Sequence, residues 1–518
     1  MIFVETVRKE KREQGQKSSY DRIIKYTGVF GGVQTLVNLI TLVKGKLVAL
    51  FIGPAGMGIT YAFNRTIDLV CKTTDLGISF SAVKTIAEKK GQSPNDLAEY
   101  NLYSAPLENE ICVVRSWSLW LGLLGSVLCF LMAPLFSRMS FDGDYSYTLS
   151  FRLLAVVVGC TSVMGGERAI LKGLGQLKQF AMNQIWVVVA TLVISTPIYM
   201  WKGMQGIVPV LVLTSLCTLA ITCSYSFRAY PYRIRLFSKK ILLDGSYIIR
   251  LGINYTVAGF LGAGSLFLVS SYMLDHGSAE DVGFYSNAVV LASYVGMLVF
   301  SAVETDFFPR LSAVNKDMCA SRQLVNEQTE VLVLLITPIV SLFLVFLPII
   351  IPLLLKRSFL PMLNATQWAA LALFLTALTR PLSFMSLSKG DSLTYLLQEL
   401  FYDMFMMAAV ICGYHYGGLE WAGVALFLSA VFDWILNAAI THTRYDYHIG
   451  AKVFRLAMLN GLLLIAITCV LRFTNGWVLY VGETVLTMLS CGLSVFYLNK
   501  ETDFLQKIWA RFNIKKHV

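Results

Sequence analysis

The sequence predicts an all-α membrane protein with about fourteen transmembrane helices, arranged as two sets of six followed by an added pair. Of its 518 residues, 56% are hydrophobic and only 14% are charged, whereas soluble domains carry roughly 25% charged residues. The mean hydropathy is +0.62. Apolar runs long enough to cross about 30 Å of hydrocarbon recur along the whole chain.

The apolar runs place the predicted spans in two series. The first series covers residues 24–50, 56–82, 111–137, 148–170, 180–201 and 205–226. The second series covers residues 247–274, 283–308, 331–355, 364–388, 393–416 and 418–441, with the added pair at 454–471 and 477–498. The predicted domains are a cytosolic segment 1–22, an N-terminal lobe 23–226, a basic connector 227–246, a C-terminal lobe 247–443, a helical pair within 444–500 and a cytosolic tail 501–518.

Basic residues between the spans set the predicted orientation. The even-numbered connections hold most of them, including Lys89, Lys178, Arg235 and Lys316, whereas the odd-numbered connections hold few. The positive-inside rule therefore places both termini in the cytoplasm. The first 22 residues have neither the uninterrupted apolar core nor the cleavage site of a signal peptide.

Charge distribution and loop length argue against several function classes. The formal net charge is +11, but the basic residues are spread over many connections, so we expect no nucleic-acid partner. The predicted outer loops are short and leave no room for a catalytic domain, so we do not expect an enzyme. The ten cysteines and five histidines lack ligand spacing, and we expect neither a metal site nor a cofactor. The stretch "GPAGMGIT" lacks the lysine of a phosphate-binding loop, which argues against ATP as the direct energy source.

The two halves share a layout of landmarks. At an offset of 225 residues, Lys25 falls on Arg250 and Gly58 falls on Gly283. Helix order and spacing recur although identity is near chance, as in the structural repeats of transporters. Lys25 and Arg250 stand where each half enters the membrane, and both are candidate substrate-binding residues.

Four charged residues lie inside the second predicted span: Arg65, Asp68, Lys72 and Asp75. At 100° per residue they occupy a sector of about 80°, which Tyr61 and Ser79 share. A charged side chain costs about 2.5–3.5 kcal/mol at the centre of an inserting helix. The stripe should therefore face protein or water rather than lipid.

Two interpretations of this stripe are open. In the first, Arg65 with Asp68 and Lys72 with Asp75 form ion pairs three residues apart, which neutralise one another at a helix interface. In the second, which we favour, the stripe lines a hydrated cavity between the halves. Two further lysines of the first span would then add unpaired positive charge, namely Lys44 and Lys46. A cavity with this positive bias should hold an anion.

Several stretches together resemble one transporter family: "IIKYTGVFGGVQTLVNLI", "VALFIGPAGMG", "DLGISFSAVKTIAE", "RAILKGLGQLKQFA", "VGFYSNA" and "FFPRLSA". They are similar to the Wzx-type polysaccharide flippases of the multidrug/oligosaccharidyl-lipid/polysaccharide (MOP) exporter superfamily. The resemblance implies two six-helix lobes around a central cavity and two appended helices. It also implies transfer of an undecaprenyl-diphosphate-linked oligosaccharide, such as an O-antigen, capsule or exopolysaccharide repeat unit, across the bacterial cytoplasmic membrane. A polysaccharide polymerase and chain-length machinery are the implied protein partners.

The resemblance also suggests coupling to sodium or protons. In the related lipid II flippases a sodium site lies on the seventh and eleventh helices, where this sequence has Asn254, Thr256, Glu399 and Asp403. Further candidates for a proton relay are Glu304, Asp306 and Asp433. In the alternative that we favour, Glu399 and Asp403 lie near the cytosolic end of their helix and are simply solvated.

Other functions fit the sequence less well. A drug/cation antiporter of the same superfamily is expected to have twelve spans, with acidic or aromatic groups where this chain has lysines. A membrane-embedded polysaccharide polymerase or ligase needs a catalytic loop on the outer side. A purely structural membrane protein leaves the charged stripe unexplained.

Overall fold

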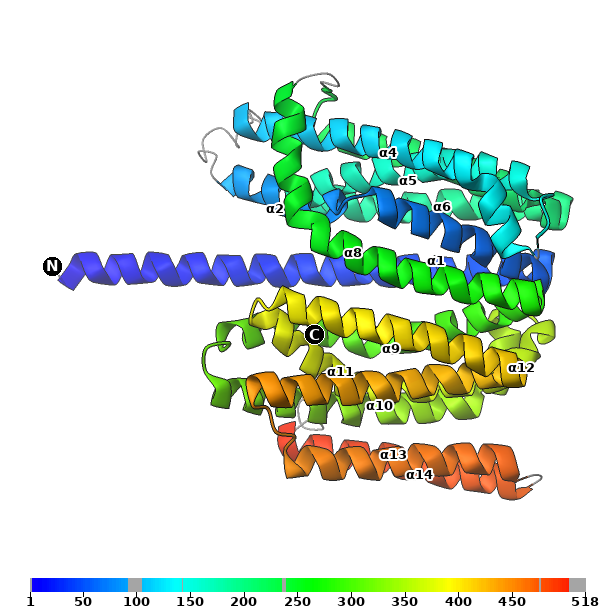
Figure 1. Ribbon diagram of the computed structural model, residues 1–518. Helices are drawn as coiled ribbons and strands as arrows, with labels where there is room; N and C mark the ends of the chain where they lie inside the picture. The colour runs from blue at the N-terminus through cyan, green and yellow to red at the C-terminus, as the bar shows by residue number, and fades with distance from the viewer. Residues whose placement is uncertain (1, 92–104, 142, 235–238, 475–476, 503–518) are drawn as a thin grey trace, which may run out of the picture. The chain divides into compact units, whose positions relative to one another are not determined.

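The computed structural model describes residues 2–91, 105–141, 143–234, 239–474 and 477–502, and these residues form helices joined by short connections (Figure 1). The α-helices are α1 (Ile2–Thr74), α2 (Ile78–Gly91), α4 (Ala105–Ser140), α5 (Thr148–Gly173), α6 (Leu177–Lys202), α7 (Ile207–Ala229), α8 (Lys239–His276), α9 (Ala279–Ala313), α10 (Met318–Leu354), α11 (Leu363–Ser388), α12 (Ser392–Tyr445), α13 (Ala451–Phe473) and α14 (Trp477–Thr502). Short 3₁₀ helices, η1 (Gly203–Gly206) and η2 (Arg357–Met362), precede α7 and α11.

The chain divides into two compact units. The first unit comprises Met1–Ile52 and Thr66–Phe260, and the second comprises Gly53–Arg65 and Leu261–Val518. Helices α1 and α8 therefore each contribute residues to both units. The boundaries of the predicted lobes, 23–226 and 247–443, do not follow this division residue by residue and stay a prediction.

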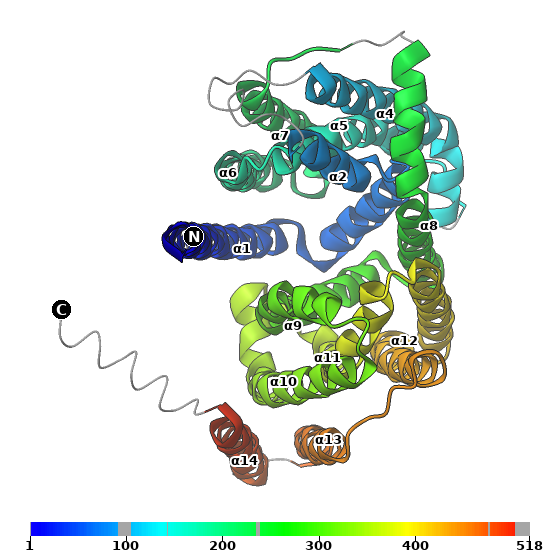
Figure 2. The same ribbon diagram turned by 90° about the vertical axis from the view of Figure 1, so that its left-hand side faces the viewer.

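The first unit is built on a bundle of α4, α5, α6 and α7, with α2 packed against α4 and α5 (Figure 2). Its principal core contains Ile78, Ile86, Leu107, Ile111 and Ile170, all of which are fully buried. These side chains come from α2, α4 and α5. Apolar packing of these side chains thus holds the three helices together.

In the second unit α11 packs against α9, α10 and α12, while α13 and α14 form a pair on α10 (Figure 2). One core joins α8, α9 and α12 through Val269, Val282 and Val410. A second core, which includes Phe307 and Met385, lies where α9, α10 and α11 approach α12.

The described helices confirm a multi-pass membrane protein. Among the described residues, nine continuous helical stretches are long and apolar enough to cross a membrane. Two of them contain kinks, at Gly53 and at Gly417–Gly418, where two predicted spans meet. A third stretch, Lys178–Ala229, joins α6 and α7 and also holds two predicted spans. The count of fourteen spans stays a prediction.

The prediction of one continuous helix over residues 56–82 is wrong. Helix α1 ends at Thr74 and α2 begins at Ile78. In the turn between them, Leu76 and Gly77 have φ angles of 47° and 72°, which no helix accepts. The predicted connector 227–246 is also partly helical, because α8 already begins at Lys239.

Two glycines related by the 225-residue offset meet within the second unit. A Cβ atom at Gly58 of α1 would lie 1.6 Å from the carbonyl oxygen of Ala279, and one at Gly283 of α9 would lie 2.2 Å from that of Pro54. The backbones of the two helices therefore touch, and only glycine permits this approach.

Candidate functional site

The charged stripe lies on α1 and in the turn that follows it. Lys44 and Lys46 are half-buried, whereas Asp68 and Lys72 are exposed. Asp75 lies just beyond the last helical residue and accepts a hydrogen bond from Ser79 Oγ at 2.8 Å. Within the first unit, the turn at residues 75–77 thus separates Asp75 from the helical part of the stripe.

The ammonium group of Lys72 attracts the carboxylate of Asp75, as one of the two interpretations requires, but from beyond salt-bridge distance. In the described part of the first unit, no ion pair links its ammonium group to Asp75. Its aliphatic stem packs against α8, since a Cβ atom at Gly259 would lie 3.1 Å from Lys72 Cδ. The stem is therefore supported by protein while the side chain as a whole stays exposed.

Arg65 belongs to the second unit, where it lies among tyrosines. Its guanidinium interacts electrostatically with the hydroxyl groups of Tyr61 and Tyr285. Tyr61 donates a hydrogen bond of 3.2 Å to Asn287 Oδ1. Arg65 Nε is buried and has no hydrogen-bond partner among the described residues, so this donor is open to an acceptor.

A second charged cluster occupies α11 and α12 in the second unit. The carboxylates of Glu399, Asp403 and Asp433 lie close enough to repel one another, and Arg380 attracts Asp433. Asn437 Nδ2 also donates a hydrogen bond of 2.8 Å to Asp433. Arg380 was not among the predicted site residues, although an arginine inside the apolar run 364–388 is the same kind of signal as the charges of the stripe.

The depth of Asp403 bears on the alternative that it is merely solvated. It is the twelfth residue of α12, which begins at Ser392, and lies about 16 Å along the helix. A Cβ atom at Gly262 of α8 would lie 3.2 Å from its Oδ2 atom. Because the hydrocarbon core is about 30 Å thick, this depth favours an intramembrane role over solvation at a helix end.

The remaining predicted residues cannot be joined to either cluster. Thr256 is half-buried on the part of α8 that belongs to the first unit. The side chains of five others, Lys25, Arg250, Asn254, Glu304 and Asp306, lie outside the described ones. In the described part of the chain, no group of three or more His, Cys, Asp and Glu side chains is arranged to hold a metal ion.

A buried ion pair in the first unit also escaped the sequence analysis. Arg115 of α4 and Glu167 of α5 have side chains only 1% and 3% exposed, with Arg115 Nε 3.0 Å from Glu167 Oε1. Arg115 also donates to the carbonyl oxygens of Tyr230 and Pro231, at 3.1 and 2.7 Å. Ser226 of α7 donates to Glu167. The network ties together α4, α5, α7 and the segment that follows α7.

A polar network links the two ends of α12 in the second unit. Asp391 caps the start of α12 by accepting from Thr394 N at 3.2 Å and from Tyr445 Oη at 2.9 Å. Arg444 Nε lies 2.7 Å from the same carboxylate. Burial alone would raise the pKa of Asp391, but hydrogen bonds from Thr394 and Tyr445, together with the Arg444 charge, lower it below its usual range.

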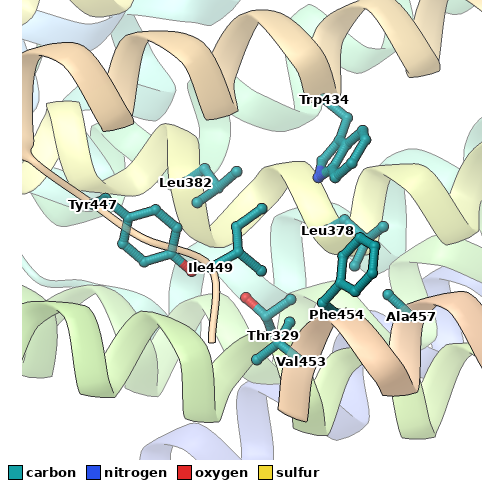
Figure 3. Close-up of a pocket in the computed structure, with 9 residues that line it drawn as sticks. All are labelled: Thr329, Leu378, Leu382, Trp434, Tyr447, Ile449, Val453, Phe454 and Ala457. Carbon is teal, nitrogen blue, oxygen red and sulfur yellow. The ribbon is translucent and has the colours of Figure 1, made fainter. Parts of the chain in front are cut away.

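One cavity of the second unit is too small for any ligand larger than water. It has a volume of about 20 Å³ and is lined mainly by apolar side chains such as Trp434, Ile449 and Phe454 (Figure 3). Its Tyr447 hydroxyl already donates to Asn326 Oδ1 at 2.8 Å. A water molecule needs two to four polar partners, so this cavity is a packing gap.

Comparison with solved structures shows the fold. The chain is similar to the lipid II flippase MurJ in an inward closed conformation, with 11% identity, a TM-score of 0.65 and coverage of 91% of this chain and 99% of that chain. It is also similar to an inward-facing multidrug resistance transporter of the MATE family of the MOP superfamily, with 16% identity, a TM-score of 0.62 and coverage of 82% and 96%. A MOP superfamily transporter from Pyrococcus furiosus gives 16% identity, a TM-score of 0.50 and coverage of 81% and 94%.

The sequence comparisons identify the family. No curated protein matches the chain. The family model described as "Polysaccharide biosynthesis protein" matches residues 23–315, which is more than half of the sequence. These findings confirm the resemblance seen in the sequence and the MOP-type transporter fold. The chain is a member of the polysaccharide biosynthesis protein family.

Proposed function

We propose that this protein is a flippase that carries oligosaccharide repeat units, linked to undecaprenyl diphosphate, across the cytoplasmic membrane. The observation that carries the proposal is Lys72, an exposed cation on a membrane-spanning helix with no ion-pair partner in the described part of its unit. An ammonium group that faces lipid costs about 2.5–3.5 kcal/mol. Its exposure is therefore best explained by contact with water and an anionic substrate.

The chemistry of the substrate fits this arrangement. A lipid diphosphate carries negative charge that cannot cross hydrocarbon without its hydration shell. Lys44, Lys46 and Lys72 would replace that hydration, while the prenyl chain stays in lipid. Because the cell interior is negative, outward movement of an anion is favoured by about 2.3 kcal/mol per charge per 100 mV.

Complementation of a strain without its own flippase tests the proposal. The parent chain should restore surface polysaccharide. Lys72→Ala should lower the transport rate about 10- to 100-fold, because a hydrogen bond to a charged group contributes about 1.5–3 kcal/mol. Lys72→Arg should retain most of the activity. Lys84→Ala is the matched control, since Lys84 is an exposed lysine of α2 that pairs with Glu88 at 3.9 Å.

Arg65→Ala tests the open donor in the second unit in the same assay, with a similar loss expected. If both Lys72→Ala and Arg65→Ala restore polysaccharide as well as the parent at equal expression, neither side chain handles substrate. The interpretation that Lys72 and Asp75 neutralise each other electrostatically would then replace the hydrated cavity.

The proposed cycle is coupled to an ion through Glu399, Asp403 and Asp433. Repulsion among these carboxylates is relieved when one of them takes up a proton or when a monovalent cation binds nearby. Proton coupling is the form tested first, because each of these carboxylates can itself take up a proton. Transport in vesicles should respond to a proton gradient in the parent and lose this response in Asp403→Asn. Transport insensitive to both sodium and proton gradients would remove the coupling proposal.

The same acidic cluster is the one observation that favours a drug/cation antiporter as the second candidate function. Transport assays in vesicles distinguish the two functions, because an antiporter exports an organic cation and a flippase moves a lipid diphosphate.

The proposed orientation has both termini in the cytoplasm. Protease treatment of intact and opened cells that carry terminal tags checks this orientation. A polysaccharide polymerase and its chain-length machinery are the proposed protein partners.

A further inference from the structure

An apolar groove lies between α11, α12 and α13 in the second unit. Its volume is about 490 Å³, within the range of about 300–1,000 Å³ that is typical of ligand pockets. Leu371, Phe427 and Leu464 line it from the three helices. The groove is apolar and has volume enough for a hydrocarbon chain, but its walls alone do not select a ligand.

Three hydrogen-bond donors without acceptors stand in the lining of this groove. Arg472 Nε, Arg472 Nη2 and Trp368 Nε1 are all buried and have no hydrogen-bond partner among the described residues. The Arg472 guanidinium lies 4.9 Å from the centroid of the Trp368 ring, so the donors are close together. Leaving buried N–H groups without acceptors is unfavourable, and the site therefore calls for ligand oxygen atoms.

The third nitrogen of the guanidinium defines the charge at this end of the groove. Arg472 Nη1 lies 2.8 Å from Glu420 Oε1, and Asn364 Nδ2 donates to Glu420 Oε2 at 3.1 Å. A positive and a negative group thus stand side by side. An anionic headgroup would meet the Glu420 carboxylate, whereas a zwitterionic headgroup matches both charges.

The position of these residues along their helices indicates depth in the membrane. Asn364 is the second residue of α11, Glu420 lies two residues after Gly418 in the kink of α12, and Arg472 is the last but one residue of α13. In the predicted orientation all three helix ends face the outer side. The polar end of the groove then lies at the outer interface, where lipid headgroups are found.

We propose that this groove binds one zwitterionic aminophospholipid of the outer leaflet as a structural lipid. Its phosphate accepts hydrogen bonds from Arg472 and Trp368, its ammonium group lies next to Glu420, and one acyl chain lies along Leu371, Phe427 and Leu464. This lipid is distinct from the transported substrate, so the inference stands whether or not the proposed function is correct.

Lipid retention tests this proposal. The full chain is placed in nanodiscs of equal parts phosphatidylethanolamine and phosphatidylglycerol, released into mild detergent, and the lipids that stay bound are counted by native mass spectrometry. We expect one phosphatidylethanolamine per chain. Arg472→Met and Trp368→Phe should each lower its retention about tenfold, because each removes donors to a charged oxygen. Glu420→Gln should reduce the preference for phosphatidylethanolamine over phosphatidylglycerol.

Two controls guard against an effect on folding. Arg357→Met removes an exposed arginine of η2, outside the groove lining, and should retain lipid as the parent does. Trp368→Phe removes the N–H group but keeps an aromatic, though smaller, side chain, so it opens less space than Trp368→Ala would. Gel filtration and thermal unfolding show whether each variant is folded.

Four results would overturn the proposal. Retention that is equal in the parent, Arg472→Met and Trp368→Phe would mean that these donors do not hold lipid. Selective retention of phosphatidylglycerol would reject the choice of headgroup. A polyprenyl diphosphate as the one retained lipid of protein from cells would assign the groove to the transported substrate. A parent chain that retains no lipid would reject the site altogether.

Discussion

An arginine and a glutamate from different helices form a pair in each unit, and the two pairs differ in how completely the protein satisfies them. In the first unit, Arg115 and Glu167 are 1% and 3% exposed, and all three guanidinium nitrogens of Arg115 have acceptors within the unit. In the second unit, Arg472 and Glu420 are 24% and 41% exposed, and two nitrogens of Arg472 have no acceptor among the described residues.

The difference separates a structural ion pair from an open one. A buried pair whose donors are all used stabilises packing only as long as both partners are present. A pair that leaves buried donors free, next to an apolar groove, is suited to a ligand. The following predictions test this distinction, beginning with the closed pair.

The largest effect is expected from Arg115→Met. Removing the cation leaves the Glu167 carboxylate buried without its charged partner, which costs about 3–5 kcal/mol of unfolding free energy. Folded protein should be nearly absent from membranes, as measured by fluorescence-detected gel filtration of a tagged chain. The double variant Arg115→Met with Glu167→Leu should recover part of the yield, because it removes the uncompensated charge. A single variant as abundant as the parent would contradict the structural role of the pair.

A smaller effect is expected from Arg472→Met. The Arg472–Glu420 pair is partly exposed, and exposed pairs contribute only about 0.2–1 kcal/mol. Thermal unfolding of the detergent-solubilised protein, stripped of lipid, should therefore shift by no more than a few degrees. An effect as large as that of Arg115→Met would show that the second pair is also structural, and the contrast between the units would be lost.

The smallest effect is expected from Asp391→Asn, and it should depend on pH. The folded pKa of Asp391 is lowered because Thr394, Tyr445 and Arg444 outweigh the opposing effect of burial. A carboxyl group with a lowered pKa stabilises the fold above its unfolded pKa, about 3.9, and this stabilisation is lost as the pH falls through the folded pKa. The variant should lose about 0.2–1 kcal/mol at pH 7, and the difference should shrink below about pH 4. A constant difference from pH 7 to pH 3 would rule out the carboxylate charge as its cause.

Hydropathy predicted the helical fold well because the bilayer requires long apolar segments whatever their packing. The kinks at Gly53 and Gly418 fall where two predicted spans meet, since each glycine has a positive φ that ends regular helix. The break before Ile78 was missed although Gly77 marks it. The polar residues on either side of Gly77 follow a helical period, and this period predicted one continuous helix. A glycine is compatible with a helix as well as with its end, so Gly77 alone did not contradict that prediction.

The site could be predicted only in part, because its charged groups meet through tertiary packing. Lys72 and Asp403 stood out as charges within apolar runs. Arg115, Arg380 and Arg472 lie in or next to such runs as well, but only the basic residues of the connections were used, to predict the orientation. Nothing in the sequence indicates that Trp368 and Arg472 lie together, since they are on different helices and more than one hundred residues apart.

The contact between Gly58 and Gly283 has a consequence for biosynthesis. Gly58 is translated 225 residues before the glycine that it touches, an interval of roughly 11–45 s at about 5–20 residues per second. Until α9 emerges from the ribosome, Gly53–Arg65 has no counterpart to pack on and must wait in lipid or in the insertion machinery. A segment that enters the membrane early is therefore among the last to reach its final packing.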